Sequence, residues 1–262
     1  MRFLIFWREG VMNLNDRVYY IPGGSRALEV VKKEFDLRGL SVTDAPSEDV
    51  THLVLGVPCR MDSNSMTALL DQLPKGVRIF GGFLDREELR EYRCCDLLKD
   101  EWYLAQNAAI TAHCALQVAL EQLPVTLEHC QVLILGWGRI GKCLAPLLKA
   151  LGADVVIAAR RVKQRAILQA LGYEAEALPL SHYILPRFRV IFNTVPAAVL
   201  SREASEFCRP DCLKIELASI PGLEGEGIVD ARGLPGKLAP ESSGKLIART
   251  VLRLSNQKED VT

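Results

Sequence analysis

Three glycines carry the clearest chemistry in this sequence. Gly136, Gly138 and Gly141 form a G-x-G-x-x-G pattern between the apolar run 132–135 and a helix-length segment. We predict that Gly136 permits a tight turn, that Gly138 lets the backbone approach a pyrophosphate, and that Gly141 lets the helix pack on the strand. The start of that helix would present its N–H groups and positive dipole to phosphates. The pattern predicts a dinucleotide site that also includes Trp137, Arg139 and Ile140.

The residues after the next predicted strand indicate which dinucleotide is bound. About twenty residues after the glycines, an NAD site places an acid that binds the ribose 2′-hydroxyl. This chain has Arg160 and Arg161 there instead, followed by Lys163. Guanidinium groups offer forked donors to phosphate oxygens, which suits a 2′-phosphate. The sequence therefore predicts NADP rather than NAD as the cofactor.

Two further predicted strands end in polar or proline-containing segments. One ends in Asn193-Thr194-Val195-Pro196, and the other runs into Ala218 and Ser219. Ligands of doubly wound sheets lie at the carboxyl ends of the strands, so both segments should line the nicotinamide side of the cofactor site.

These segments require a scaffold of alternating strands and helices. Apolar runs at 18–21, 52–55, 77–80, 132–135, 155–157, 190–192 and 213–217 predict strands. Helix-length stretches at 26–37, 66–73, 140–151 and 163–171 separate several of them. Such alternation is typical of parallel sheets covered by helices. We predict an α/β fold of two Rossmann-like, three-layer domains with parallel sheets.

The connections between the domains define the expected boundaries. The segment between Tyr92 and Gln106 fits neither a strand nor a helix, residues 107–123 predict a long helix, and Pro124 ends it. We expect an N-terminal, substrate-side domain at 1–106, a connecting helix at 107–124 and a dinucleotide-binding domain at 125–240. Residues 241–262 should form a C-terminal helix, at about 243–255, and a tail, with the helix packing back on the first domain.

Composition narrows the class of protein. The 262 residues contain 32 Lys and Arg against 32 Asp and Glu, and 49% are hydrophobic. A neutral chain offers no electrostatic footprint for nucleic acid or a membrane surface. The N-terminal apolar run 3–7 is too short for export, which predicts a cytoplasmic protein. Its eight cysteines form no C-x-x-C pair, so we expect reduced, structural thiols and no metal.

Several separate motifs together resemble the A subunit of dipicolinate synthase. They lie at 107–112, 135–141, 193–196, 216–219 and 234–244, and residues 21–26 are similar to the family's first glycine turn. The chain departs from the family at His113-Cys114, where Glu-Gly is usual, at Glu216, where Asp is frequent, and in the loop 220–227. The resemblance implies an NADP-linked oxidoreductase that converts dihydrodipicolinate to dipicolinate during sporulation, in the mother cell, together with the B subunit of the same synthase. We also expect a homo-oligomer.

The substrate-side residues are predicted from this reaction. His113 is the candidate proton acceptor because an imidazole titrates near working pH, and Thr111 and Ser219 are its candidate neighbours. A dicarboxylate needs donors at both ends. We expect these donors from Arg26, Asn107, Ser242 and Ser243, with the substrate in a cleft between the domains.

Two alternatives stay open. A dehydrogenase of small 2-hydroxy acids shares the two-domain plan, although such enzymes generally have a late catalytic histidine and no histidine follows His182 here. A nucleotide-binding regulatory or interaction subunit without turnover is the other alternative.

Overall fold

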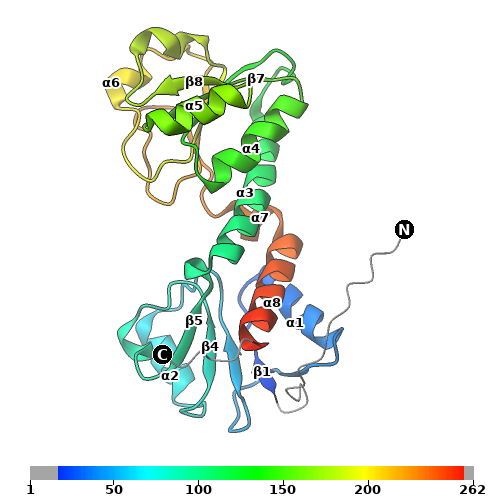
Figure 1. Ribbon diagram of the computed structural model, residues 1–262. Helices are drawn as coiled ribbons and strands as arrows, with labels where there is room; N and C mark the ends of the chain where they lie inside the picture. The colour runs from blue at the N-terminus through cyan, green and yellow to red at the C-terminus, as the bar shows by residue number, and fades with distance from the viewer. Residues whose placement is uncertain (1–16, 257–262) are drawn as a thin grey trace, which may run out of the picture. The chain divides into compact units, whose positions relative to one another are not determined.

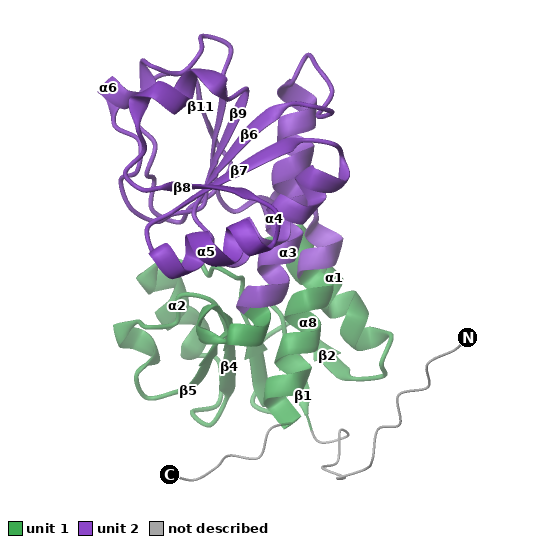
Figure 2. Cartoon of the chain, turned by 45° about the horizontal axis from the view of Figure 1, so that its top comes forward, with its two compact units in different colours: residues 1–103, 244–262 green, residues 104–243 purple. Residues whose placement is uncertain are grey.

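The computed structural model describes residues 17–256 and divides into two compact units (Figure 1). Unit 1 contains the chain up to Tyr103 and resumes at Gly244, whereas unit 2 contains residues 104–243 (Figure 2). The predicted N-terminal apolar run and the C-terminal tail beyond residue 256 lie outside the described residues.

Unit 1 contains a five-stranded parallel sheet in the order β2-β1-β3-β4-β5. The strands are β1 Val18–Tyr20, β2 Ser41–Thr43, β3 His52–Val54, β4 Arg78–Gly81 and β5 Arg93–Asp96. The helical segments are α1 Arg26–Asp36, α2 Ser63–Leu70, η2 Glu87–Leu89 and η3 Leu97–Lys99. The central strands are buried, and Leu53 and Ile79, which share a register position, are fully inaccessible.

Unit 2 contains a six-stranded parallel sheet in the order β11-β10-β9-β6-β7-β8. The strands are β6 Gln131–Leu135, β7 Asp154–Ala159, β8 Glu174–Ala177, β9 Val190–Asn193, β10 Leu213–Glu216 and β11 Ile228–Asp230. The helical segments are α3 Glu101–Gln122, α4 Arg139–Ala150, α5 Val162–Ala170, η4 His182–Arg187, α6 Arg202–Ser205 and α7 Leu234–Leu238.

The sheet of unit 2 is buried on both faces. Val132 and Ile134 of β6 pack in one apolar cluster with residues of α3 and α4. Leu133 and Leu135, which alternate with them, pack in a second cluster with residues of η4 and of the segment that follows α6. A strand buried on both faces needs a continuous apolar run rather than an alternating one, and the run 132–135 provides it. The structure confirms the predicted α/β class with its layered parallel sheets.

The last helix, α8, spans Pro240–Asn256 and packs in unit 1, as predicted. Figure 1 shows it beside α1. The backbones approach so closely at Gly244 that an added Cβ would lie 2.4 Å from the carbonyl oxygen of Ala27. Near the other end of α8, the buried Arg17 donates to the Asn256 side chain at 2.8 Å and to the Ser255 carbonyl at 3.1 Å.

Two element boundaries differ from the prediction. The segment after Tyr92 forms β5 and η3, and α3 begins at Glu101 rather than at residue 107. Helix α8 begins at Pro240 rather than at residue 243. Proline lacks the N–H that an interior helical residue donates, so it suits a first turn, where this donor has no intrahelical partner.

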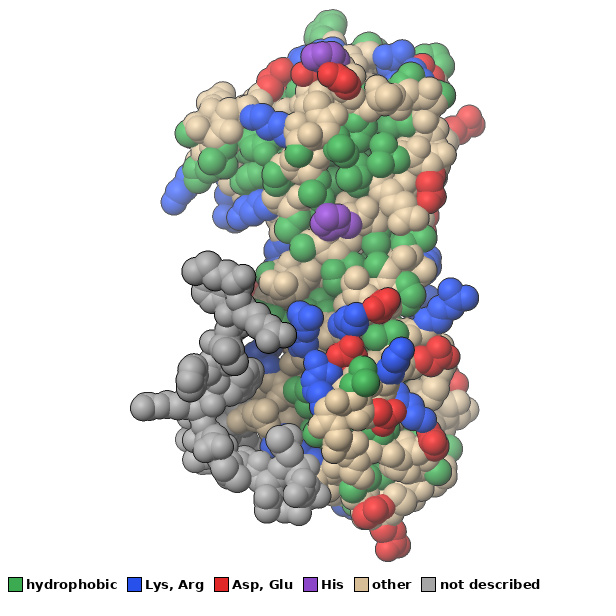
Figure 3. Space-filling model, turned by 90° about the vertical axis from the view of Figure 1, so that its right-hand side faces the viewer, with side chains coloured by type: hydrophobic (Ala, Val, Ile, Leu, Met, Phe, Trp, Pro, Cys, Tyr) green, Lys and Arg blue, Asp and Glu red, His purple; other side chains and the backbone are tan. Residues whose placement is uncertain are grey.

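The described surface carries both signs of charge. Figure 3 shows Lys and Arg side chains interspersed with Asp and Glu side chains on one face of the molecule, in keeping with a formal net charge of zero. Among the described residues, no helix is both long and apolar enough to cross a membrane.

Candidate functional site

The glycine turn after β6 has a different steric reason for each glycine. Gly136 has φ 102°, in the region that favours glycine, and an added Cβ would lie 2.6 Å from Oγ1 of Thr194. A Cβ on Gly141 would lie 2.5 Å from the carbonyl oxygen of Gly136, so only glycine lets α4 pack this closely on the turn. By contrast, a Cβ on Gly138 would have nothing within 4 Å. Gly138 therefore borders open space at the start of α4.

That open space is part of a hollow of about 560 Å³, here named the strand-end hollow. It lies where β6, β7 and β9 end, which is where ligands bind in doubly wound sheets. Its volume is within the ~300–1,000 Å³ typical of small-molecule sites. Its lining residues are Gly136, Trp137, Gly138, Ala159, Arg160, Arg161, Gln164, Leu178, Thr194, Val195 and Pro196.

The charged residues of this lining are both arginines. Arg160 and Arg161 follow β7 and are exposed, and no Asp or Glu of the described chain lines the hollow. Arg165 of α5 fixes the turn that carries them, because its guanidinium donates to the carbonyls of Ala159 and Arg160, both at 2.8 Å. The hollow thus combines two cationic side chains with the N-terminus of α4, a setting that attracts phosphate groups.

A second hollow of about 420 Å³ adjoins the first, and Arg160, Leu178 and Val195 line both. Its other residues are Pro179, Leu180, His182, Ala197, Ala198, Val199, Leu200, Ser201, Ala204 and Glu224. The lining is mainly apolar. Together the two hollows offer a charged part and an apolar part to one extended ligand.

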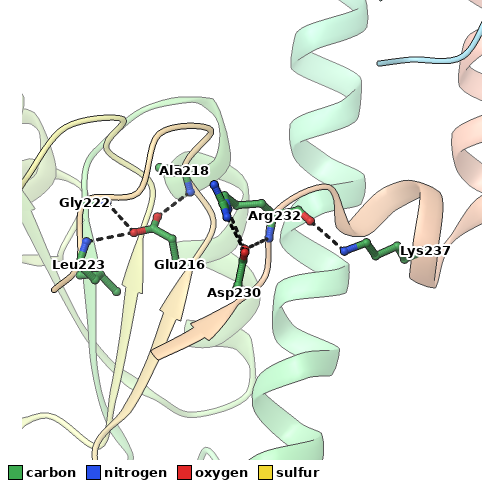
Figure 4. Close-up of polar contacts among 7 residues, drawn as sticks. All are labelled: Glu216, Ala218, Gly222, Leu223, Asp230, Arg232 and Lys237. Carbon is green, nitrogen blue, oxygen red and sulfur yellow. Dashed lines mark hydrogen bonds and ion pairs between the residues drawn. The ribbon is translucent and has the colours of Figure 1, made fainter. Parts of the chain in front are cut away.

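A buried acid organises the ends of β9 and β10. Asn193 and Glu216 are 0% and 2% exposed, and the Asn193 amide donates to both carboxylate oxygens, at 2.9 and 3.0 Å. The same carboxylate accepts backbone N–H groups from Ala218 at 2.9 Å, Gly222 at 2.7 Å and Leu223 at 3.1 Å (Figure 4). Glu216 therefore folds the segment 217–223 over the end of its own strand.

Asn193 also fixes the backbone of Val195, a residue that lines the hollow. Its Oδ1 accepts the N–H of Val195 at 2.9 Å, while its Nδ2 donates to the Val195 carbonyl at 3.1 Å. Val195 lines both hollows. The contacts made by Asn193 and Ala218 thus place them behind the site as support, and neither side chain lines the strand-end hollow.

Arg232, which follows β11, forms an ion pair with Asp230. Its guanidinium donates to both carboxylate oxygens of Asp230, at 2.8 and 2.5 Å, and this contact lowers the pKa of Asp230 to about 2. The Arg232 carbonyl accepts from Lys237 Nζ at 3.5 Å (Figure 4). These pairs fix the start of the chain segment that leads to α7.

The predicted catalytic residues lie in unit 2. His113 is exposed on α3, and Thr111 is buried, with its hydroxyl donating to the carbonyl of the half-buried Asn107 at 2.8 Å. Ser219 is exposed in the segment that Glu216 holds. Ser242 is exposed in the first turn of α8, whereas Ser243 is buried.

Arg26 lies in unit 1 as the first residue of α1, and it is exposed. Ser25 caps this helix by accepting the N–H of Leu28 at 3.2 Å. This start follows β1, so Arg26 stands at the carboxyl end of the unit 1 sheet.

Only some of the residues predicted to bind the dinucleotide line the strand-end hollow. Gly136, Trp137, Gly138, Arg160, Arg161, Thr194, Val195 and Pro196 line it, whereas Arg139, Ile140, Gly141, Lys163, Asn193 and Ala218 do not. Sequence analysis did not identify Gln164 or Leu178. Gln164 follows Arg161 by one helical turn, a spacing that could have revealed it.

Comparisons with known proteins agree with this geometry. Residues 107–204 match the family model described as the NAD binding domain of D-isomer specific 2-hydroxyacid dehydrogenase. The A subunit of dipicolinate synthase from Bacillus subtilis is 24% identical over 91% of this chain and 95% of its own length.

Solved structures show the same fold. The crystal structure of the dipicolinate synthase A subunit from Bacillus halodurans aligns with a TM-score of 0.77 and 20% identity, over 92% of this chain and 98% of that one. The transhydrogenase from Sinorhizobium meliloti aligns with a TM-score of 0.70 and 12% identity, over 91% and 93% of the two chains. The predicted resemblance to the A subunit of dipicolinate synthase is confirmed, and the family match indicates an NAD(P)-dependent, dehydrogenase-like protein.

Proposed function

We propose that this chain is an NADP-dependent oxidoreductase of the dipicolinate synthase type, which oxidises dihydrodipicolinate to dipicolinate. The observation that carries the cofactor assignment is the pair Arg160 and Arg161 at a strand-end hollow whose described lining contains no acid. The substrate assignment rests on the similarity to the A subunit of dipicolinate synthase, which extends over 91% of this chain.

The residues of the hollow fit a dinucleotide. The open space at Gly138 leaves room for a pyrophosphate beside the N-terminus of α4. Arg160 and Arg161, with Lys163 nearby in the sequence, would hold the 2′-phosphate, and the segment 193–196 would face the nicotinamide. Arg139 and Ile140 form the first turn of α4, where their backbone N–H groups have no intrahelical partner to donate to.

The reaction removes a hydride and a proton from a ring that becomes aromatic. NADP, when bound, supplies the hydride acceptor. The protein must align the reacting carbon and accept the proton, and alignment is the larger task. We assign proton acceptance to His113, whose exposed ring can pass a proton on to water. Ser219 would orient the substrate ring, and Arg26, Asn107, Ser242 and Ser243 would bind the two carboxylates. Thr111 supports α3 instead, because its buried hydroxyl donates to the Asn107 carbonyl and residues two apart on a helix do not face each other.

The relative from Bacillus subtilis is named as one subunit of a synthase, which supports a partner for this chain. We propose that this partner is the B subunit of dipicolinate synthase. A homo-oligomer, action in the cytoplasm and a role in the mother cell during sporulation belong to the same proposal. None of these assignments involves nucleic acid or a membrane.

Cofactor choice is tested by removing the arginines one at a time. Loss of one charge-assisted phosphate contact costs ~1.5–3 kcal/mol, so Arg160→Ala or Arg161→Ala should weaken NADP binding by roughly 10- to 150-fold. NAD binding, measured by the same titration calorimetry, should change little. Arg202→Ala is the matched control, since it removes an exposed guanidinium of α6 outside the strand-end hollow. Equal weakening of NADP and NAD would overturn the assignment of these arginines.

The role of His113 is tested by turnover. Removing a general base typically costs ~10²–10⁴-fold, so His113→Ala should lower kcat by that factor and leave NADP affinity unchanged. His129→Asn is a suitable control, because His129 has φ 57° and asparagine tolerates that backbone region. Near-normal turnover of His113→Ala across pH would remove His113 from the mechanism.

A second candidate function has its own support. The family match at 107–204 favours a 2-hydroxyacid dehydrogenase. Reduction of NAD or NADP by a panel of small 2-hydroxy acids, without reduction by a dihydrodipicolinate source, would decide for this candidate.

A further inference from the structure

Phe83 has a backbone conformation that bulky residues disfavour. It follows β4 and has φ 60°, in the left-handed region that glycine and asparagine tolerate and that large side chains rarely adopt. The residue is 62% exposed, although Gly82 and Leu84 on either side of it are buried. Burial of the ring therefore does not offset the cost of this conformation. Strained residues that are held in place in this way gather at functional sites.

Contacts on both sides of this residue hold the turn. The N–H of Gly82 donates to the Gly56 carbonyl at 3.1 Å, and the Gly82 carbonyl accepts the N–H of Cys59 at 2.8 Å. On the other side, the N–H of Leu84 donates to the Asp96 carboxylate at 3.0 Å. The turn after β4 therefore presents the exposed ring from a fixed backbone.

The same contacts bring a cation to the neighbouring segment. Arg60 follows Cys59 and Phe83 follows Gly82, so each comes directly after one partner of the hydrogen bond between these two segments. Arg60 is exposed, as Phe83 is. A guanidinium group and an aromatic ring therefore lie on adjoining segments at the surface of unit 1.

The charge of Arg60 is not compensated by an acid. Within the part of the chain that the structure describes, no Asp or Glu forms an ion pair with it. Asp62 instead caps α2 by accepting the N–H of Ser65 at 3.0 Å, and Asp85 pairs with Lys99 at 3.7 Å. Arg60 is therefore available to an anion.

Both residues lie at the edge of the unit 1 sheet where a ligand is expected. The chain places β2 on one side of β1 and β3 on the other, so the strand order reverses between β1 and β3. Ligands of open parallel sheets bind at the carboxyl ends of the strands, beside such a reversal. Arg26 follows β1, Arg60 follows β3 and Phe83 follows β4. Arg26 likewise forms no ion pair with a described acid.

We propose that Arg60 and Phe83 bind the ring dicarboxylate of the proposed reaction, in addition to Arg26. The substrate ring stacks on Phe83, one carboxylate pairs with Arg60 and the other pairs with Arg26. Two guanidinium groups on neighbouring strand ends suit two carboxylates, because each can form a bidentate, charge-assisted contact. Stacking on an aromatic side chain strengthens as the ring becomes flat and aromatic, so Phe83 favours the direction of the oxidation. The inference rests on the proposed function for the identity of the ring.

The test measures binding, so it does not depend on turnover. The full chain, saturated with NADPH in metal-free buffer, is titrated calorimetrically with pyridine-2,6-dicarboxylate. A second titration uses cis-cyclohexane-1,3-dicarboxylate, which has the same two carboxylates on a ring that is not flat. Arg60→Gln should weaken binding of the pyridine roughly tenfold, because one charge-assisted contact is lost. Lys75→Gln is the matched control, since it removes an exposed cation before β4, at the opposite end of that strand, and should change neither affinity.

Two variants of Phe83 separate stacking from structural support. Phe83→Leu keeps an apolar side chain and should weaken binding of the pyridine about threefold to tenfold, while binding of the cyclohexane changes by less than about twofold. Phe83→Asn suits the left-handed backbone, so it should weaken binding of the pyridine without lowering the melting temperature. Tyr183→Leu, at an exposed aromatic residue of unit 2, is the control and should change neither affinity.

The outcomes distinguish this inference from the proposed function. The inference alone is overturned if the native chain binds the pyridine and Arg60→Gln and Phe83→Leu bind it equally well. Equal losses for the flat and the saturated ring, or a melting temperature of Phe83→Asn that falls together with the affinity, would overturn the role of Phe83. The expected losses without any oxidation of dihydrodipicolinate would refute the proposed reaction and leave the binding site standing. No binding of the pyridine by the native chain would overturn both.

Discussion

Replacing Glu216 by glutamine tests whether this buried acid holds the ends of β9 and β10 together. The glutamine side chain has the same shape, but one carboxylate oxygen becomes an NH₂ group. One oxygen accepts from Ala218, and the other accepts from Gly222 and Leu223. In either orientation of the amide, at least one backbone N–H loses its acceptor and faces another donor.

The expected magnitude follows from these contacts. A buried donor without an acceptor costs ~1–3 kcal/mol, and the remaining bonds lose the extra strength that a charged acceptor gives, ~0.5–1 kcal/mol each. We therefore expect Glu216→Gln to lower the free energy of unfolding by about 2–4 kcal/mol. That is a large fraction of the ~5–15 kcal/mol typical of native proteins.

The assay combines denaturant unfolding with amide hydrogen exchange. In Glu216→Gln, the amides of Ala218, Gly222 and Leu223 should exchange at least tenfold faster than in the unmodified chain. Glu226→Gln removes the same charge from an exposed position of the neighbouring loop and should change stability by less than ~0.5 kcal/mol. Equal stability of the two variants, with unchanged exchange at the three amides, would refute the role of Glu216.

Three further predictions concern packing, pH and substrate affinity. Gly141→Ala should weaken the binding of NADP and of NAD alike by more than ~10-fold in calorimetry, because the alanine Cβ would lie 2.5 Å from the Gly136 carbonyl oxygen. Gly76→Ala is the control and should leave both affinities unchanged, because a Cβ at that position has nothing within 4 Å. Burial, together with the charges of Arg17 and Arg78, lowers the pKa of His52 from 6.5 to about 4. Between pH 6.5 and pH 4 the imidazole is therefore protonated in the unfolded chain but not in the folded one, so the free energy of unfolding falls as the pH drops. Urea unfolding should therefore show that the free energy of unfolding is about 2 kcal/mol lower at pH 5 than at pH 7. An equal decrease in His52→Phe would contradict the assignment of this pH dependence to His52. Arg26→Lys should raise KM for the dicarboxylate and leave NADP affinity unchanged, since lysine cannot form a bidentate bond; an unchanged KM would remove Arg26 from the substrate site.

The sequence predicted the central strands of both sheets and missed every edge strand. β2, β5, β8 and β11 stand at the ends of the two strand orders. An edge strand has a neighbour on one side only and is less covered, so its sequence needs fewer apolar residues. β8, with the sequence EAEA, is the plainest case, since its residues are exposed or half-buried. Its hydrogen bonds to β7 define it, and no local pattern does.

The candidate site likewise contains residues that the sequence predicted and residues that it missed. The glycine turn was predictable because its three glycines lie within six residues of chain. There the positive φ of Gly136 and the close approach of Gly141 to the Gly136 carbonyl are local demands, and Gly138 borders open space. Leu178 was missed because it follows the unpredicted strand β8. The contact between Asn193 and Glu216 joins side chains 23 residues apart, and only the pairing of β9 with β10 brings them together. Long-range polar contacts of this kind leave no periodic signal in the sequence.

The central claim is most directly tested by following NADPH and the pyridine product together. The purified chain, with and without the B subunit of dipicolinate synthase, is supplied with a dihydrodipicolinate source and NADP. We predict that NADPH and dipicolinate form in equal amounts, that NAD supports a much lower rate at the same concentration, and that Arg161→Ala narrows this difference. Dipicolinate that accumulates without NADPH, or no product with either cofactor while NADP binds, would contradict the proposed oxidation.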